Sequence, residues 1–201
     1  MRPSRFTRLG GFGALVGGTL WVAALGAVQL LSADLTGVVA VPALLFMVAL
    51  AALQVRHTGR WGTLGIIGFV IALFGSILLA YGSIGRVAMS GDLLGFAFGP
   101  MTFAGLAPGA LVFGAGAALV AVSVIVANVL PRLSSIPLLV GAVGVAVAGG
   151  LALGQGFLGG SGAVFPLSLA PLAGLWAVFG VGWLWLGYLL WSERIADASW
   201  Q

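Results

Sequence analysis

Long apolar runs separated by short polar segments dominate the chain. Spanning the hydrocarbon core of a bilayer takes about 20 apolar residues in a helix. A transmembrane β-barrel would instead need alternating segments of about 10 residues, and the runs here are continuous. We therefore predict an all-α polytopic membrane protein, a single six-helix bundle over residues 1–201. Its expected helices cover Leu9–Leu31, Thr36–Val55, Gly62–Ile84, Gly109–Leu130, Ile136–Phe157 and Pro171–Trp191.

One further apolar stretch, residues 93–108 (LLGFAFGPMTFAGLAP), fits this scheme less well. It is short, Pro100 interrupts it, and treating it as a span leaves hardly any residues for a turn before the helix expected from Gly109. We predict an interfacial or re-entrant segment on the outer face, with its backbone groups satisfied by protein or water. An ordinary apolar loop lying on the bundle is the alternative.

The N-terminal run begins like a signal peptide, with basic residues followed by apolar ones. However, the apolar part from Leu9 to Leu31 is longer than the roughly 7–15 residues of a signal-peptide core. We therefore expect a retained first transmembrane helix.

The arginines are distributed unevenly between the two ends of the expected helices. Cytoplasmic loops of membrane proteins carry an excess of arginine and lysine. Only Arg86 lies on the side opposite to the rest. We predict that both termini are cytoplasmic (N-in/C-in), with these seven residues on the inner side: Arg2, Arg5, Arg8, Arg56, Arg60, Arg132 and Arg194.

Composition supports the membrane assignment and limits the chemistry. Only 6% of the residues are charged, against about 25% in soluble domains. The net charge of +4 comes from arginines spread singly between apolar runs, which does not indicate a nucleic-acid surface. The absence of cysteine excludes disulfides, iron–sulfur ligation and thiol catalysis.

The 34 glycines include many pairs at the four-residue spacing that lets membrane helices approach closely, such as Gly13 with Gly17 and Gly105 with Gly109. This indicates either a tightly packed bundle or a seam between molecules. A weak repeat is also visible: Thr36, Thr102 and Ser168 are 66 residues apart, each with a proline nearby. It indicates either three copies of a helical hairpin or the common chemistry of helix starts.

Polar residues within the expected helices offer one candidate pathway. Ser76, Ser123 and Asn128 are able to line a route for a solute or to form hydrogen bonds between helices. Near the outer boundary, Arg86 has Asp34 and Asp92 as possible partners, although loop charges in water are the simpler interpretation.

Aromatic residues gather at the end of the last expected helix: Trp183, Trp185, Tyr188 and Trp191. We interpret them as anchors at the membrane–water interface. The stripe formed by Trp176, Gly180, Trp183 and Gly187 allows an alternative, a groove for a pigment or lipid.

His57, the only histidine in the chain, is the single obvious candidate for acid–base or metal chemistry. It lies in a short segment with Arg56, Arg60 and Trp61, where neighbouring positive charge disfavours its protonation and metal binding. We interpret the segment as a topology determinant. No catalytic motif has a partner histidine or carboxylate at useful spacing, so we predict a protein that is not an enzyme, with no catalytic, cofactor-binding or metal-binding residue and no cofactor.

Several segments together resemble a loose group of small, uncharacterised multi-pass membrane proteins of prokaryotes: GALVGGTLWV, LQVRHTGRWGTLG, VLPRLSSIPLLVGA and VGWLWLGYLLWSER. The resemblance implies a bundle in the cytoplasmic membrane and no particular activity. Our hypothesis is a non-enzymatic membrane protein, an accessory or structural subunit or a self-associating helical bundle, whose partners are the lipid bilayer and either another membrane protein or its own copies. The alternative is a small transporter or channel for an uncharged or lipidic solute.

Overall fold

The computed structural model describes residues 5–31, 36–56, 62–89, 95–127, 132–159 and 170–192, and these fall almost entirely into helices. A short 3-10 helix, η1, precedes the second α-helix. The elements in chain order are α1 (Arg5–Leu31), η1 (Thr36–Val39), α2 (Ala40–Arg56), α3 (Gly62–Met89), α4 (Gly95–Val126), α5 (Arg132–Gly159) and α6 (Ala170–Trp191).

The six α-helices confirm the predicted all-α class. Five of them contain an apolar stretch long enough to cross a membrane, and α2, with 17 residues, is shorter. Lipid offers no hydrogen-bonding groups to the backbone, whereas a helix pairs its own N–H and C=O groups. A continuous apolar sequence in a bilayer therefore favours the helical conformation. The chain is therefore an integral multi-pass membrane protein.

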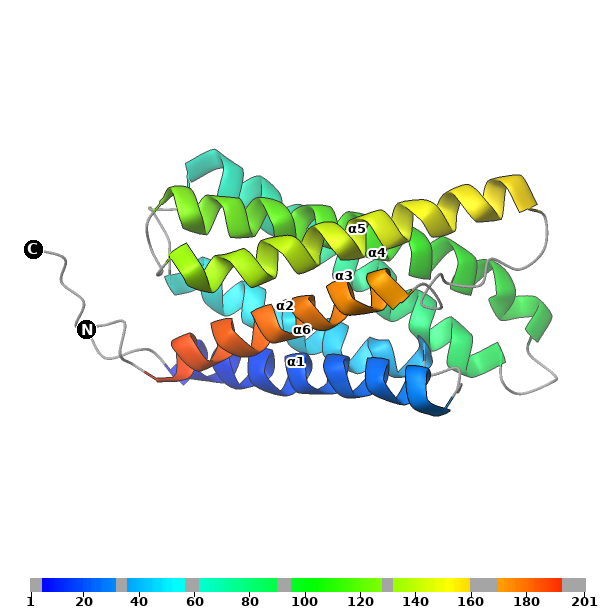
Figure 1. Ribbon diagram of the computed structural model, residues 1–201, viewed down its shortest axis with the longest axis horizontal. Coiled ribbons are helices and arrows are strands. Elements are labelled where there is room, and N and C mark those ends of the chain that lie inside the picture. Colours follow the sequence, from blue (N-terminus) through cyan, green and yellow to red (C-terminus); the bar gives the residue numbers. More distant parts are fainter. Residues whose placement is uncertain are drawn as a thin grey trace, which may run out of the picture.

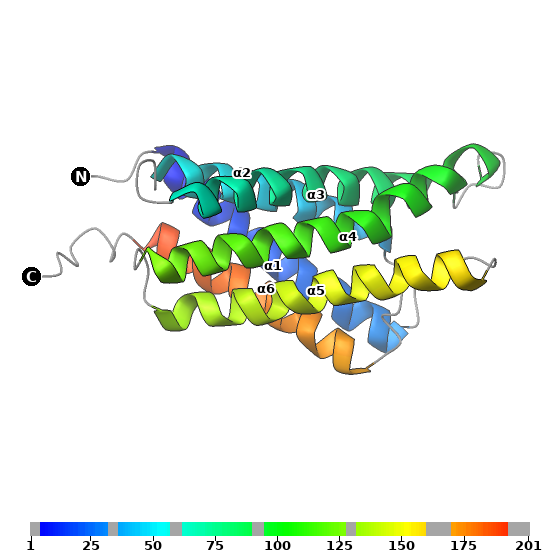
Figure 2. The same ribbon diagram turned by 90° about the horizontal axis from the view of Figure 1, so that it is seen from above.

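The helices form a closed ring. Each α-helix packs against the next one in the chain, and α6 packs against α1, as Figures 1 and 2 show from two directions. Because neighbours run antiparallel, Arg5, Arg56 and Trp191 lie at one end, which we call the Arg5 end, at the left in Figure 1. Arg86 lies near the opposite end. Among the described residues, the arginines are thus distributed unevenly between the two ends of the bundle.

The structure differs from the sequence prediction over residues 93–108. Helix α4 begins at Gly95 rather than Gly109 and runs for 32 residues to Val126. From Gly95 onward this segment is therefore the first part of a continuous helix, not a separate re-entrant segment, and it contains both Pro100 and Pro108. The prolines misled the prediction because membrane helices tolerate them when neighbouring groups compensate for the lost hydrogen bonds.

Glycines bring the backbones of neighbouring helices into direct contact. A Cβ atom on Gly109 of α4 would lie 2.6 Å from the backbone nitrogen of Leu79 in α3, and one on Gly114 would lie 2.6 Å from the carbonyl oxygen of Ala142 in α5. Real Cβ atoms do not approach this closely. The small-residue spacing seen in the sequence is therefore used largely within the bundle, where close approach maximises dispersion contacts.

In each of the three helical hairpins α1–α2, α3–α4 and α5–α6, a glycine of the first helix packs on a phenylalanine of the second. A Cβ atom would meet the ring of Phe46 if placed on Gly17, and would overlap the backbone of Phe113 or Phe179 if placed on Gly75 or Gly141, respectively. In the second and third hairpins both partners are shifted by the same 66 residues. The first hairpin does not share this register, since Gly17 and Phe46 lie 58 and 67 residues before Gly75 and Phe113, respectively. The 66-residue spacing therefore extends to the packing of two hairpins, and both explanations of the repeat stay open.

Candidate functional site

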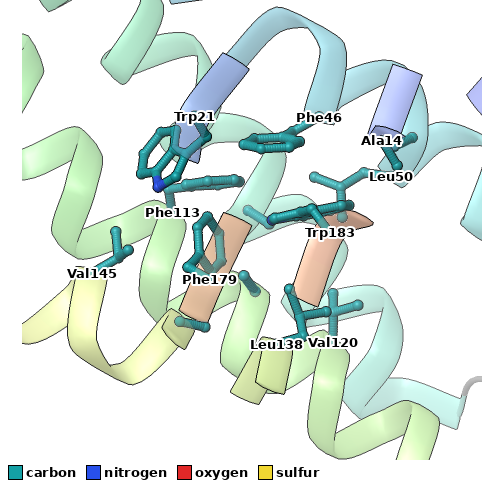
Figure 3. Close-up of a cluster of buried hydrophobic side chains, with 14 of the residues drawn as sticks. Ala14, Trp21, Phe46, Leu50, Phe113, Val120, Leu138, Val145, Phe179 and Trp183 are labelled. Carbon is teal, nitrogen blue, oxygen red and sulfur yellow. The ribbon is translucent and has the colours of Figure 1, made fainter. Parts of the chain in front are cut away.

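The centre of the ring is filled by aromatic side chains. Phe46 of α2, Phe113 of α4, and Phe179 and Trp183 of α6 have no exposed surface, and Trp21 of α1 is almost fully buried beside them. Figure 3 shows these rings pointing toward one another, and they come from α1, α2, α4 and α6. They fill the position where a channel along the axis of the ring would run.

The rings meet in the offset and edge-to-face arrangements that aromatic quadrupoles favour. Phe46 stacks on Trp183 with ring centroids 4.5 Å apart, and Phe113 meets Phe179 edge-on at 5.4 Å. Trp21 stacks on Trp176 at 5.1 Å. Such pairs contribute about 0.5–1.5 kcal/mol each beyond simple burial, so the cluster joins the helices α1, α2, α4 and α6 into one core.

Sequence reasoning missed most of this cluster, and it placed Trp183 wrongly. We expected Trp183 to be an interfacial anchor with Trp185, Tyr188 and Trp191, but only those three are about half exposed. Both faces of α6 are apolar, so the sequence does not separate these residues, and only the burial in the structure does. The buried large side chains of α6 recur every three or four positions: Trp176, Phe179, Trp183, Leu186 and Leu190.

The glycine–tryptophan stripe of α6 does not form an open groove. A Cβ atom on Gly180 would lie 2.6 Å from Cγ2 of Val22, and one on Gly187 would lie 2.7 Å from the backbone nitrogen of Leu15. Helix α1 therefore covers the stripe. This packing removes the support for a pigment or lipid groove at these residues.

The two central indoles differ in their hydrogen bonding. Nε1–H of Trp21 donates to the backbone carbonyl of Trp176 over 3.0 Å. The Nε1 atom of Trp183 is buried and has no hydrogen-bond partner. An unsatisfied buried donor costs about 1–3 kcal/mol. The ring contacts of Trp183 therefore stabilise its position while its Nε1–H group remains without an acceptor.

The candidate polar pathway is not assembled by the described residues. The Ser76 hydroxyl donates to the carbonyl of Ala72 over 2.9 Å, and the Ser123 hydroxyl donates to the carbonyl of Val120 over 2.7 Å. Each hydroxyl is thus satisfied within its own helix. Asn128, the third member, lies outside the described residues.

Most of the charged candidates also lie outside the described residues. These are His57 and Arg60 of the segment between α2 and α3, and the acidic residues Asp34 and Asp92; Trp61 of the same segment also lies outside them. Arg86 is described and exposed. Arg56 is also described: it is the last residue of α2, it is half-buried, and its Nη1 atom is buried without a hydrogen-bond partner.

Within the described part of the chain, no group of three or more histidine, cysteine, aspartate or glutamate side chains is placed to hold a metal ion. None of the four acidic residues falls in that part either. What the described residues do assemble is an apolar core inside a ring of helices whose outer faces are also largely apolar.

No protein-family model, curated protein or solved structure matches this chain. Its class therefore follows from the helices themselves: it is a multi-pass helical membrane protein.

Proposed function

We propose that the protein is a non-enzymatic integral membrane protein that acts through helix packing, as an accessory or structural subunit of a membrane assembly or as a self-associating bundle. The observation that carries the proposal is the aromatic centre of the ring, where Phe46, Phe113, Phe179 and Trp183 are fully buried. A bundle of this kind presents its outer helix faces, rather than an internal site, to other molecules.

The outer faces supply the surface that such a role requires. Large apolar side chains on α3, including Phe74, Ile77 and Ile84, are about half exposed, as are Val143 and Val147 on α5. Most of the described glycines pack directly against a neighbouring helix of the bundle, so they are already covered. A lateral interface would therefore use these larger side chains, and the internal seams would keep the bundle rigid.

The alternative role in transport has less support. Ser76 and Ser123 are bonded within their own helices, and aromatic rings occupy the axis of the ring. Transport along that axis would require four buried rings to separate. Liposomes containing the purified protein should therefore take up uncharged solutes no faster than empty liposomes, and faster uptake would favour the transport role instead.

The absence of native cysteine allows a direct test of lateral association. Single substitutions Ile77→Cys, Val147→Cys and Val181→Cys place one thiol on the outer face of α3, α5 or α6, respectively. Oxidative cross-linking in native membranes, followed by mild extraction and mass spectrometry, should give a cross-linked product at one of these faces. Ala72→Cys, at a fully buried position, is the matched control and should give none.

A dimer of the chain in this experiment would identify self-association, and a product with a second membrane protein would identify a subunit role. If all three outer variants remain monomeric, and the wild-type protein is extracted as a monomer with no copurifying protein, the proposal is wrong.

We further propose that the protein lies in the plasma membrane of a prokaryote with both termini in the cytoplasm. The support is the placement of Arg5, Arg8 and Arg56 at the Arg5 end and of Arg86 near the other, together with the tendency of arginine to remain on the cytoplasmic side.

A further inference from the structure

At the Arg5 end of the helix pair α1–α2, the cation Arg56 has one donor atom without an acceptor. Arg56 ends α2, and its Nη1 atom is buried without a hydrogen-bond partner. One helical turn earlier, Ala52 and Leu53 are fully buried, so Arg56 continues the inward face of α2. The neighbouring Val55 is more than half exposed and marks the outward face. A buried guanidinium N–H without an acceptor is costly, which points to an anionic group that completes the site.

Helix α1 brings a second cation to the same place. Gly10 of α1 packs directly against Ala52 of α2. Because the two helices are antiparallel, the first turn of α1, from Arg5 to Arg8, lies beside the last turn of α2, which ends at Arg56. Arg5 and Arg8 are both exposed. The described residues contain no carboxylate to balance the charges of Arg5 and Arg56.

Apolar side chains continue from this basic cluster along the outer face of α1. Phe6, Leu9 and Phe12 are about half exposed, and the Phe12 ring lies 6.0 Å from the ring of Trp191 at the end of α6. Aromatic rings of this kind favour the headgroup level of a membrane. The surface therefore changes from cationic to apolar along α1, as does a phospholipid from its phosphate to its acyl chains.

We propose that an anionic phospholipid binds specifically at the Arg5 end of α1–α2. Its phosphate oxygens accept hydrogen bonds from the guanidinium groups of Arg56 and Arg5, and its acyl chains lie on Phe6, Leu9 and Phe12. Arginine suits this role because its planar guanidinium presents several donors to phosphate oxygens. The inference is independent of whether the protein acts as a subunit or associates with itself.

The test is native mass spectrometry of the full-length protein in mild detergent, with phosphatidylglycerol or phosphatidylcholine of identical acyl chains added. The wild-type protein should retain phosphatidylglycerol preferentially. Arg56→Gln should reduce that preference about fivefold, the factor that one arginine contributes near an anionic lipid surface. Arg5→Gln, at the exposed first position of α1, should reduce it as well, and remains informative if Arg56→Gln fails to fold.

Two controls separate this proposal from its competitors. Arg86→Gln removes an arginine near the opposite end and should leave the lipid preference unchanged. The double variant Glu193→Gln/Asp197→Asn removes the two carboxylates that follow α6 in the chain, and it should also retain the preference. If that variant and Arg56→Gln instead lose thermal stability equally, with no lipid preference in the wild-type protein, the tail carboxylates neutralise Arg56 and the proposal is wrong.

Equal retention of both lipids by the wild-type protein, or an unchanged preference in both Arg56→Gln and Arg5→Gln, would also overturn the proposal. An excess of inorganic phosphate distinguishes the source of the anion. It should displace little phosphatidylglycerol, since the acyl chains contribute to binding. Complete displacement would identify a site for free phosphate rather than for a lipid.

Discussion

At the residue scale, the core shows how ring packing and polar satisfaction compete in one cluster. Trp21 is almost fully buried and Trp183 fully buried among the same aromatic rings. Of these two indoles, only that of Trp21 has a hydrogen-bond acceptor. Backbone carbonyls of membrane helices are normally occupied by their own helix, so a buried indole must find one with spare capacity. The carbonyl of Trp176 serves Trp21 in this way.

This difference predicts unequal effects of two matched substitutions. Trp21→Phe and Trp183→Phe both reduce ring volume at a buried position, but only Trp21→Phe removes a hydrogen bond. Trp183→Phe instead removes an unsatisfied donor. We expect Trp21→Phe to lower the free energy of unfolding by about 1–3 kcal/mol more than Trp183→Phe. Unfolding in mild detergent, followed by tryptophan fluorescence and by circular dichroism, measures the difference, and equal losses would contradict it.

At the scale of elements, the sequence predicted the number and kind of helices because the bilayer dictates both. Any long apolar run must satisfy its backbone internally, so α1, α3, α5 and α6 begin and end within a few residues of their predicted bounds. The start of α4 was missed because Pro100 and Pro108 suggested a break. The sequence did not predict which helices pack against one another. An apolar residue such as Phe46 or Trp183 is equally compatible with the core and with lipid.

The glycine contacts within the hairpins predict a graded series of Gly→Ala effects. At Gly75 and Gly141 the added methyl group would overlap the backbone of Phe113 or Phe179, so the helices must separate. We expect each change to destabilise the protein by about 1–3 kcal/mol. At Gly17 the nearest atom, 2.9 Å away, belongs to the Phe46 ring. A side chain adjusts more readily than a backbone, so the loss should be smaller.

Gly154 provides the control for this series, because a Cβ atom there would meet nothing within 4 Å. Gly154→Ala should leave the stability unchanged or raise it slightly, as alanine is the better helix former. Thermal stability in detergent, monitored by size-exclusion chromatography, gives the ranking. A loss at Gly154 equal to that at Gly75 would show that the effect does not arise from helix contacts.

At the scale of the whole molecule, the closed ring explains why the aromatic cluster is fully buried. A row of six helices would leave α1 and α6 with open flanks, and Trp21 would face lipid. Closure brings α6 against α1, and this contact joins the two ends of the chain. It was invisible in the sequence, because the alternation of spans and turns fixes only which helices follow one another.

Closure predicts that a disulfide between α1 and α6 forms in a chain that has no cysteine of its own. A Cβ atom on Gly11 lies 3.0 Å from Cβ of Leu190, slightly closer than the roughly 3.5–4.5 Å of natural disulfides, so a small adjustment suffices. With a protease site inserted at Asp92, the variant Gly11→Cys/Leu190→Cys should remain one species after oxidation and cleavage. It should separate into two halves on reduction.

Two further pairs make this result specific to ring closure. Gly13→Cys/Val48→Cys joins α1 to α2 across 3.8 Å, a natural disulfide distance, and should oxidise fully while the cleaved halves still separate. Gly11→Cys/Ile77→Cys pairs α1 with the outer face of α3 and should not oxidise within one molecule. If Gly13→Cys/Val48→Cys oxidises but the halves of Gly11→Cys/Leu190→Cys separate under the same conditions, α6 does not close the ring. In that case the surface now covered between α1 and α6 would be open to lipid or to a partner helix.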